Sequence, residues 1–382
     1  MMKKIITLLT AVALLAASAL ALVSCKSPAD KTSTTVYGFN YSVTKDKDAG
    51  EGFVGFATVK KYVLTDAQAE IVRNGNFYGN MLDLEVPAVY ETEEGKYKVN
   101  AIAASAFADQ ALVKSVKIGD NVTSIGEACL AGCVNLESVT VPFAGASENA
   151  VGYKKTVGYL FGITETSGCT LTTVYHNDGD SDNSKSYYIP DSLVTVTLTG
   201  DVISEYAFNG LAVKNVVLSG SPEVVPAGAF ANMTKISTVV LPESVTVIEK
   251  GAFKNSSVID VNFADLEDLK AIGAEAFYGC ARLAEFAPAD SLEVLGAKAF
   301  YNASALKSVS VAETAVTALP EYVFYGCSKL ESVFLPAGVA LAKGAFVRCP
   351  ELKTVKAGDG YVTPSYDGAK QAFDDNYLNS FS

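Results

Sequence analysis

The amino-acid sequence predicts a β-rich solenoid of the α/β type, a right-handed stack of coils in which each coil adds one strand to a parallel β-sheet. One short segment recurs about every 23 residues over residues 225–352, and self-similarity with a period of about 20 to 50 residues is typical of solenoids. In each copy an apolar residue stands five positions before a Phe. Leu, Val and Leu then follow the Phe at the sixth, ninth and eleventh positions, as Leu330, Val333 and Leu335 do after Phe324.

Two columns of this repeat can be followed through nine coils. The residue five positions before the Phe is always aliphatic, at Ile102, Ile125, Ile203, Val225, Ile248, Ile272, Leu295, Leu319 and Leu341. The Phe position is filled by Phe107, Leu130, Phe208, Phe230, Phe253, Phe277, Phe300, Phe324 and Phe346. Successive members from Phe208 onward are 22, 23, 24, 23, 24 and 22 residues apart. This regular register predicts that like residues stack on like along the array.

The strand of each coil is expected where apolar and polar residues alternate. Val333 and Leu335 are predicted to face the core, and Ser332 and Phe334 to face outward. The three- and four-residue spacings that lead up to the Phe predict a single helical or 3₁₀ turn on the opposite side of the coil. With parallel strands about 4.8 Å apart, about eleven coils would make a sheet about 50 Å long.

Composition limits the classes of partner. The 382 residues are expected to form one elongated body, because length in a repeat array counts coils. At 49% apolar residues the chain can bury a continuous core. The net charge of −12 becomes −14 when a leader containing Lys3 and Lys4 is removed. Nucleic acid needs a basic footprint and anionic lipid a polybasic patch, so both are disfavoured as partners.

The first 24 residues have the features of a signal peptide. Lys3 and Lys4 precede a mostly apolar run over residues 5–22, and Cys25 follows Leu-Val-Ser. This end resembles bacterial lipoprotein leaders, and the resemblance implies cleavage before Cys25 and lipidation of that residue. More than one acyl chain would anchor the protein to a membrane without a spanning helix. An ordinary signal peptide or a retained anchor is the alternative, because the apolar run is long enough to span a bilayer.

A tether and two caps are expected around the repeats. Residues 25–36 contain the lipidated Cys and a small, polar segment typical of a solvated tether. Residues 37–78 are interpreted as an N-terminal cap over the apolar end of the stack, with β-like pieces at 37–43 and 53–64. Residues 358–382 leave the repeat, and the helical spacing of their apolar residues predicts a C-terminal cap.

The repeat domain is expected over residues 79–357, with an irregular insertion at 143–190. After Leu130 the next Phe of the column comes only 78 residues later, and a polar loop at 176–186 lies between them. Residues 193–198 still have the spacing of the strand. The stack is therefore expected to continue while the loop bulges outward.

The repeated motif resembles the treponemal, BspA-like class of bacterial leucine-rich repeats. The resemblance covers residues 80–357, and a Gly-Tyr-Leu-Phe-Gly segment at 158–162 resembles a variant that recurs in the class. The class carries a Cys three positions after the Phe, which this chain has at Cys133, Cys280, Cys327 and Cys349. The resemblance implies a leucine-rich-repeat coil stack displayed at the cell surface, where it binds proteins of host cells or other microbes.

The cysteines of that column are expected to be buried thiols, because other coils place small or apolar residues such as Met233 and Ala303 there. Export would permit disulfides. Cys280 and Cys327 are too far apart, since two coils span about 9.6 Å and a disulfide bridges at most about 7 Å. Cys327 and Cys349 lie in adjacent coils, so a disulfide between them stays open, and a metal cluster is the least favoured alternative.

No catalytic arrangement is predicted. His176 is the only His, and a Cys–His pair with Cys169 would rest on loop residues with no supporting pattern. The acids of residues 178–182 alternate as at the start of a calcium loop, but the Gly and Glu that complete such a loop are missing. A solvated acidic loop is favoured over a weak cation site. The chain is thus expected not to be an enzyme and to hold no metal or cofactor.

The predicted function is protein binding by a lipid-anchored, monomeric scaffold at the cell surface. The favoured contact residues lie outward on the strands, where a solenoid offers a broad surface: Val217, Thr238, Val240, Ser332 and Phe334. Ser, Thr and Val also suit any exposed sheet, which is the simpler interpretation. The loop at 176–186 is the competing site. The alternative function is a structural or carbohydrate-binding envelope protein, although the chain has no Trp for a sugar platform.

Overall fold

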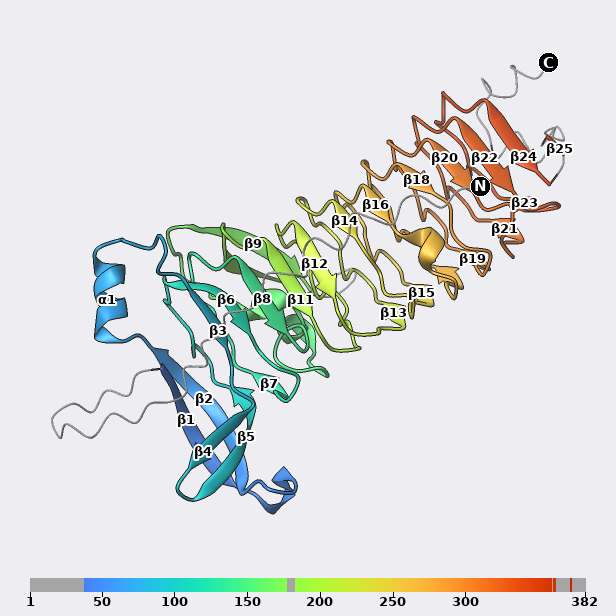
Figure 1. The fold of residues 1–382 in the computed structure, drawn as a ribbon. Coiled ribbons are helices and arrows are strands. Elements are labelled where there is room, and N and C mark those ends of the chain that lie inside the picture. Colours follow the sequence, from blue (N-terminus) through green and yellow to red (C-terminus); the bar gives the residue numbers. More distant parts are fainter. Residues whose placement is uncertain (1–37, 177–182, 359, 362–371, 373–382) are drawn as a thin grey trace, which may run out of the picture. The chain divides into compact units, whose positions relative to one another are not determined.

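The computed structural model of the protein describes residues 38–176, 183–358, 360–361 and 372. The chain divides into two units, residues 1–36 and 37–382, and all of the described residues lie in the second. This unit is a stack of coils whose strands follow one another in sequence order along the stack (Figure 1). The predicted solenoid is therefore confirmed.

The predicted parallel sheet receives one strand from each of eleven coils. These strands are β3 (Leu82–Glu85), β6 (Val113–Lys117), β8 (Ser138–Val141), β11 (Thr195–Leu198), β12 (Asn215–Leu218), β14 (Thr238–Val239), β16 (Asp260–Val261), β18 (Glu285–Phe286), β20 (Ser308–Ser310), β22 (Ser332–Leu335) and β24 (Thr354–Ala357). From β6 to β24, an inward residue of each strand, such as Val116 in β6 and Val355 in β24, is at most 6% exposed. The predicted alternation of inward and outward residues is thus confirmed.

The sheet is not continuous along the stack, and the prediction of one long sheet is wrong in this respect. Its ladder is interrupted after β12 and again after β16. Both breaks follow a coil whose strand begins one residue early, because Val216 and Val261 stand only eight positions after Phe208 and Phe253. The ninth position is usual, as for Val239 after Phe230. Each short coil still pairs with the coil before it, β12 with β11 and β16 with β14, and the ladder is interrupted only toward the coil that follows.

A second set of short parallel strands lies where the residue five positions before the Phe falls. It comprises β5 (Gly95–Ile102), β7 (Ser124–Ile125), β13 (Val224–Val225), β15 (Val247–Ile248), β17 (Ala271–Ile272), β19 (Val294–Leu295), β21 (Ala318–Leu319) and β23 (Ala340–Leu341). Neighbours such as β15 and β17 pair in parallel, with Ile248 beside Ile272. The aliphatic column of the repeat therefore forms a second, narrower ladder across the core from the main sheet.

The predicted helical or 3₁₀ turn before the Phe is wrong. In all nine coils the residues two before and two after the Phe position have φ between 55° and 73°, and a left-handed residue cannot continue a right-handed helix. The amides on this side bond instead to the next coil: Phe253 donates to the carbonyl of Ala276 at 2.7 Å and Asn255 to that of Tyr278 at 2.7 Å. The three-residue spacing that suggested a helix comes instead from turns, whose amides form hydrogen bonds to the next coil.

The Phe column stacks as predicted from Phe208 to Phe346. Successive ring centroids are 4.8 to 5.8 Å apart and the ring planes are within 24° of parallel. Each of these rings is at most 1% exposed. The stack of rings is therefore the apolar centre of the C-terminal half of the array.

The insertion supplies a coil of its own. The amide of Leu130 donates to the carbonyl of Leu160 at 2.8 Å, and the next residue, Phe161, is fully buried. Strand β11 then pairs with β8 on one side and β12 on the other. The stack thus continues through the insertion, as predicted. The inserted elements are η2 (Gly152–Lys155), η3 (Val157–Leu160), β9 (Cys169–Tyr175) and β10 (Ser184–Pro190).

The hairpin of β9 and β10 corrects the predicted loop at 176–186. Residues 184–186 belong to strand β10, with Ser184 beside Tyr175 and Ser186 beside Thr173. Residues 177–182, which include the predicted calcium-like acids, lie outside the described residues. The irregular part of the insertion is therefore shorter than the sequence indicated.

The N-terminal part contains the two predicted β segments as the antiparallel strands β1 (Gly38–Lys45) and β2 (Gly55–Val63). Strand β2 pairs in parallel with β5, so that this hairpin continues the narrower ladder. Between and after these strands lie η1 (Lys47–Ala49), α1 (Asp66–Arg73) and β4 (Val89–Thr92). Helix α1 was not predicted, although Thr65 and Gln68 form a capping box at its start.

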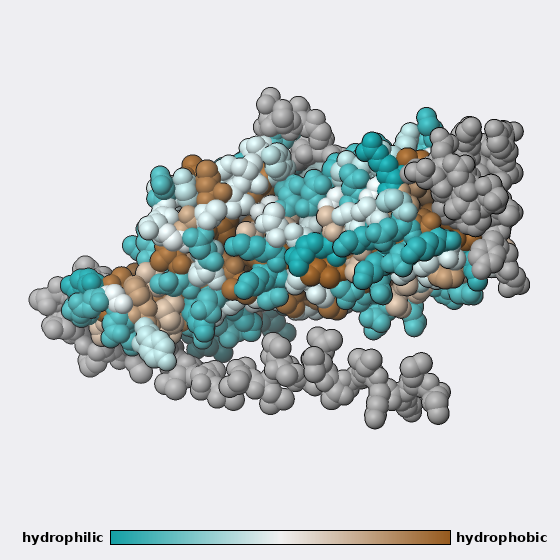
Figure 2. Space-filling model, turned by 90° about the horizontal axis from the view of Figure 1, so that it is seen from above, coloured by the Kyte–Doolittle hydropathy of each residue, from teal (hydrophilic) through white to brown (hydrophobic). Residues whose placement is uncertain are grey.

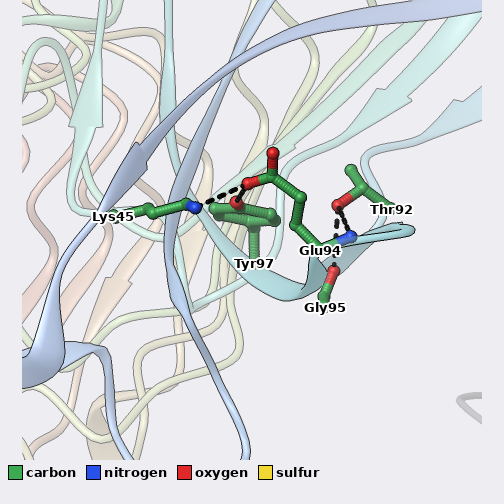
Figure 3. A network of polar contacts seen from close by, with 5 residues as sticks. All are labelled: Lys45, Thr92, Glu94, Gly95 and Tyr97. Atoms are coloured by element: carbon green, nitrogen blue, oxygen red, sulfur yellow. Dashed lines mark hydrogen bonds and ion pairs between the residues drawn. The ribbon is translucent and has the colours of Figure 1, made fainter.

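A polar network joins the two hairpins of this region (Figure 3). Lys45, at the end of β1, lies 2.8 Å from the carboxylate of Glu94, which also accepts a hydrogen bond from the Tyr97 hydroxyl at 3.3 Å. In the same turn, the Thr92 hydroxyl donates to the carbonyl of Gly95 at 3.3 Å. The ion pair is exposed, so its contribution to stability is small.

At the C-terminal end, β25 (Gly360–Tyr361) pairs antiparallel with β24. Ala372 is fully buried, and its carbonyl accepts a hydrogen bond from the amide of Phe346 at 2.8 Å. One coil earlier, the amide of Phe324 makes the equivalent hydrogen bond to the carbonyl of Ala345. Ala372 therefore takes the place that a residue of a further coil would occupy. Most of the predicted C-terminal cap lies outside the described residues.

Candidate binding surfaces

The outward residues of the main strands form one candidate surface, called here the outward sheet face. The five predicted contact residues all lie on it: Val217 in β12, Thr238 in β14, Val240 directly after β14, and Ser332 and Phe334 in β22. Val217 and Val240 are 43% and 55% exposed. Phe334 faces solvent but is half-buried, because its neighbours in the sheet, Ser310 of β20 and Lys356 of β24, flank it on both sides. The two valines are therefore the more accessible apolar groups.

Short polar side chains make up most of the remaining outward sheet face. In the N-terminal coils they bond across strands: Ser115 donates to Asp83 at 2.5 Å, Lys117 pairs with Glu85 at 2.8 Å and Asn215 donates to Thr195 at 3.3 Å. Val217 and Val240 are therefore the most exposed apolar groups of an otherwise largely polar face.

The thiols of the repeat are buried and structural. Each donates to the carbonyl of the Phe in the coil before it: Cys133 to Phe107 at 3.0 Å, Cys280 to Phe253 at 3.0 Å, Cys327 to Phe300 at 3.3 Å and Cys349 to Phe324 at 3.2 Å. Burial raises the pKa of Cys133 and of Cys280 to about 12, which keeps these thiols protonated and unreactive. No disulfide joins the cysteines of the described residues, so Cys327 and Cys349 are not bridged in this structure.

His176 and Cys169 do not form a pair. Cys169 begins strand β9 and His176 directly follows its last residue, so seven residues of extended chain, about 23 Å, separate them. The His176 ring lies beside that of Tyr153, with centroids 6.2 Å apart. Burial, and then the charge of Lys155, lowers the pKa of His176. The residue is therefore a neutral contact of the insertion at pH 7.

Two lysines, one in the hairpin and one at the end of η2, fix the insertion to the coils. Lys185 in β10 lies 2.5 Å from Glu127 and 3.8 Å from the centre of the Tyr153 ring. Lys155 pairs with Glu205 and lies 5.3 Å from the centre of the Tyr206 ring. Lys185 thus holds the hairpin, and Lys155 holds the η2 segment, against the coils, so the stem of the insertion is part of the scaffold.

A row of tyrosines on the turn side of the last coils was not predicted from the sequence. Tyr278, Tyr301 and Tyr325 each follow a Phe of the central column directly, and we call them the tyrosine ladder. Their rings stack with centroids 4.8 and 4.6 Å apart and planes at 2° and 10°. Lys254 lies 5.2 Å from the Tyr278 ring at one end, and Arg348 lies 5.5 Å from the Tyr325 ring at the other. The recurring Phe-Tyr pair in three successive copies was the available signal.

The surface has no single dominant apolar area on the side seen in Figure 2, where hydrophobic and hydrophilic residues are interspersed. Across the described ranges, no helix combines the length and apolar character needed to cross a membrane.

Comparison with known proteins gives one matching family. Six copies of the BspA type leucine-rich repeat region match, at residues 94–149, 183–268, 201–313 and 265–367. No curated protein matches the chain significantly.

Three solved structures are similar to the chain. A leucine-rich repeat protein from Bacteroides ovatus is 20% identical, with 85% of this chain and 88% of that chain covered and a TM-score of 0.37. The pneumococcal vaccine antigen PcpA is 15% identical, with coverages of 84% and 80% and a TM-score of 0.38. A leucine-rich cell surface protein from Faecalibacterium prausnitzii is 17% identical, with coverages of 90% and 99% and a TM-score of 0.29.

Proposed function

This chain belongs to the BspA-type leucine-rich repeat family, and from that premise we propose that it is a lipid-anchored protein of the cell surface that binds other proteins through its outward sheet face. The matched family is a repeat region rather than an enzyme family, which agrees with a scaffold that binds without catalysis. The protein partners are extracellular: matrix proteins of a host or surface proteins of other microbes.

The observation that carries the proposal is the pair of exposed valines on adjacent coils. Val217 and Val240 follow the inward residues Val216 and Val239 of β12 and β14, and both point away from the core. A partner that covers these exposed aliphatic side chains removes their apolar surface from water, which favours association. The neighbouring Thr238 supplies a hydrogen-bonding group at the same place.

We predict that Val240→Lys lowers the affinity for a protein partner by about tenfold or more, because a charge would be desolvated at the centre of the interface. Thermal stability should change little, since Val240 is 55% exposed. Surface plasmon resonance with immobilised fibronectin, laminin and collagen gives the affinity, and differential scanning calorimetry the stability. Phe334→Ala is expected to act in the same direction.

The matched control for this prediction is deletion of residues 177–182, which leaves strands β9 and β10 intact. This deletion should reduce binding less than Val240→Lys does. Loss of binding in the deletion variant, together with normal binding by both sheet variants, would assign the partner to the insertion instead.

Anchoring is proposed at Cys25, where a leader ending in Leu-Val-Ser precedes the Cys. We predict that Cys25→Ala abolishes incorporation of a labelled fatty acid and moves the protein from the detergent phase to the aqueous phase, because two or more acyl chains are what make such an anchor stable. The control is Cys169→Ala, which alters a half-buried Cys of the described chain. Undiminished labelling of the Cys25→Ala protein would exclude this anchor.

A further inference from the structure

The tyrosine ladder presents ring edges and hydroxyls rather than ring faces. Each inner face is covered by the next ring, and the two outer faces lie against Lys254 and Arg348. The face of an aromatic ring carries negative charge density and its edge positive, and a phenol is a hydrogen-bond donor. Burial and the neighbouring Tyr325 raise the pKa of Tyr301, so its hydroxyl stays protonated. The groups left for a partner are therefore those that attract anions.

The charged residues of these coils are also unevenly distributed, with basic residues in excess on the turn side and acidic residues in excess elsewhere. The turn segments of the five coils around the ladder, residues 249–255, 273–279, 296–302, 320–326 and 342–348, contain five Lys or Arg and three Glu. The chain between these segments contains nine Asp or Glu and four Lys or Arg. Glu275 and Lys254 pair with each other at 2.7 Å, and Glu249 accepts the amide of Ala227 at 3.0 Å. The turn segments thus carry a net charge of +2, against −5 for the chain between them, within a protein of net charge −12.

Arg348 stands at a position where its residue type is costly. It lies two after Phe346 with φ of 60°, and the other eight coils fill this left-handed position with Gly, Asn or Asp, the residues that adopt it most easily. The exception occurs in the coil where the side chain closes the end of the tyrosine ladder. Other residue types, such as Glu275 and Lys298, also have left-handed φ in these turns, so the feature specific to Arg348 is its place over the ring of Tyr325.

We propose that the tyrosine ladder, with Lys254 and Arg348 at its ends, binds a linear anionic polysaccharide laid along the stack. A protein partner would pack on exposed ring faces, and the faces of these rings are covered. Of the described residues, none of the exposed large apolar side chains lies in the five turn segments either. Phenol rings whose centroids repeat every 4.6 to 4.8 Å present a row of hydroxyls, which suits a polymer that repeats its carboxylates and hydroxyls along its own length. This surface is separate from the outward sheet face and does not depend on the protein-binding proposal.

The test uses the full-length chain in mild detergent and biolayer interferometry with immobilised alginate, a polyuronate. The wild type should bind at low ionic strength and lose affinity as salt is added, because added salt screens charge. The triple variant Tyr278→Phe, Tyr301→Phe and Tyr325→Phe keeps the stacked rings and removes only the hydroxyls; it should bind at least about tenfold more weakly. Arg348→Asn, which restores the usual residue of its column, should also weaken binding while keeping or raising the melting temperature.

Three results would overturn the proposal. One is alginate binding by the triple variant and by Arg348→Asn with wild-type affinity. Another is equal binding to neutral dextran, and the third is stronger binding to poly-glutamate than to alginate, which would point to an acidic protein. Phe334→Ala, on the outward sheet face, is the matched control and should bind alginate normally. Loss of protein binding in that variant with alginate binding retained separates the two surfaces.

Discussion

Phe277→Ala is expected to lower the free energy of unfolding by about 3–5 kcal/mol. Phe277 is fully buried between Phe253 and Phe300, with ring centroids 4.9 and 5.2 Å away and planes within 7° of parallel. The ring of Phe263 also meets it edge-on at 5.3 Å. Truncation removes contacts to three rings at once and leaves a cavity in a stack that the hydrogen bonds between coils hold open.

Urea denaturation followed by circular dichroism measures this loss. Val294→Ala is the matched control, because Val294 is apolar, lies in the same coil region and is 54% exposed; its effect should stay within about 0.5 kcal/mol. Phe277→Leu should fall between the two, since it keeps most of the volume and removes the stacking. A Phe277→Ala protein as stable as the Val294→Ala control would mean that the Phe column does not support the coils.

Gly273→Ala is expected to cost about 1–3 kcal/mol or more, although it adds a single methyl group. Gly273 directly follows β17, and a Cβ there would lie 2.6 Å from the amide nitrogen of Lys250 and 2.7 Å from the carbonyl carbon of Glu249. These atoms belong to the backbone of the preceding coil and cannot turn away. The amide of Gly273 also bonds to the carbonyl of Ile248 at 2.7 Å, so the methyl group would force apart two coils that this bond holds together.

Ala342→Gly is the matched control, because Ala342 occupies the same position of a later coil and its amide bonds to Leu319 at 3.0 Å. Removal of that methyl group should cost no more than about 1 kcal/mol, through the entropy of the unfolded chain. Equal melting temperatures for Gly273→Ala and the wild type would show that the coils separate more easily than their hydrogen bonds indicate.

The sequence determined the two apolar columns and the alternation of the strands, because each is a spacing of residues that the core requires. It was ambiguous on the turn side: i to i+3 contacts occur both in a helical turn and in the turns found here, and Tyr206, Glu275 and Lys298 at left-handed positions carry no signature of that conformation. The Gly, Asn and Asp that recur two positions after the Phe were a usable signal. So was the shortened spacing of Val216 and Val261, which marks both breaks in the sheet.

The candidate surfaces could be predicted only in part. Alternation placed Val217 and Val240 outward, but it could not distinguish them from Phe334, whose exposure depends on the side chains of two flanking coils. The tyrosine ladder required knowing that the position after the Phe faces outward on the turn side. The spacing of the core residues does not predict the identity of the partner, because the same coil stack forms with many different outward residues.

Hydroxyl-radical footprinting of the bound protein tests most directly whether the outward sheet face is the binding surface. The measurement compares side-chain oxidation in the free chain and in its complex with a matrix protein that shows saturable binding. Protection is predicted at Val217, Val240 and Phe334, with Tyr278, Tyr301 and Tyr325 oxidised as in the free chain. Protection confined to the tyrosines or to strands β9 and β10, with both valines still oxidised, would contradict it.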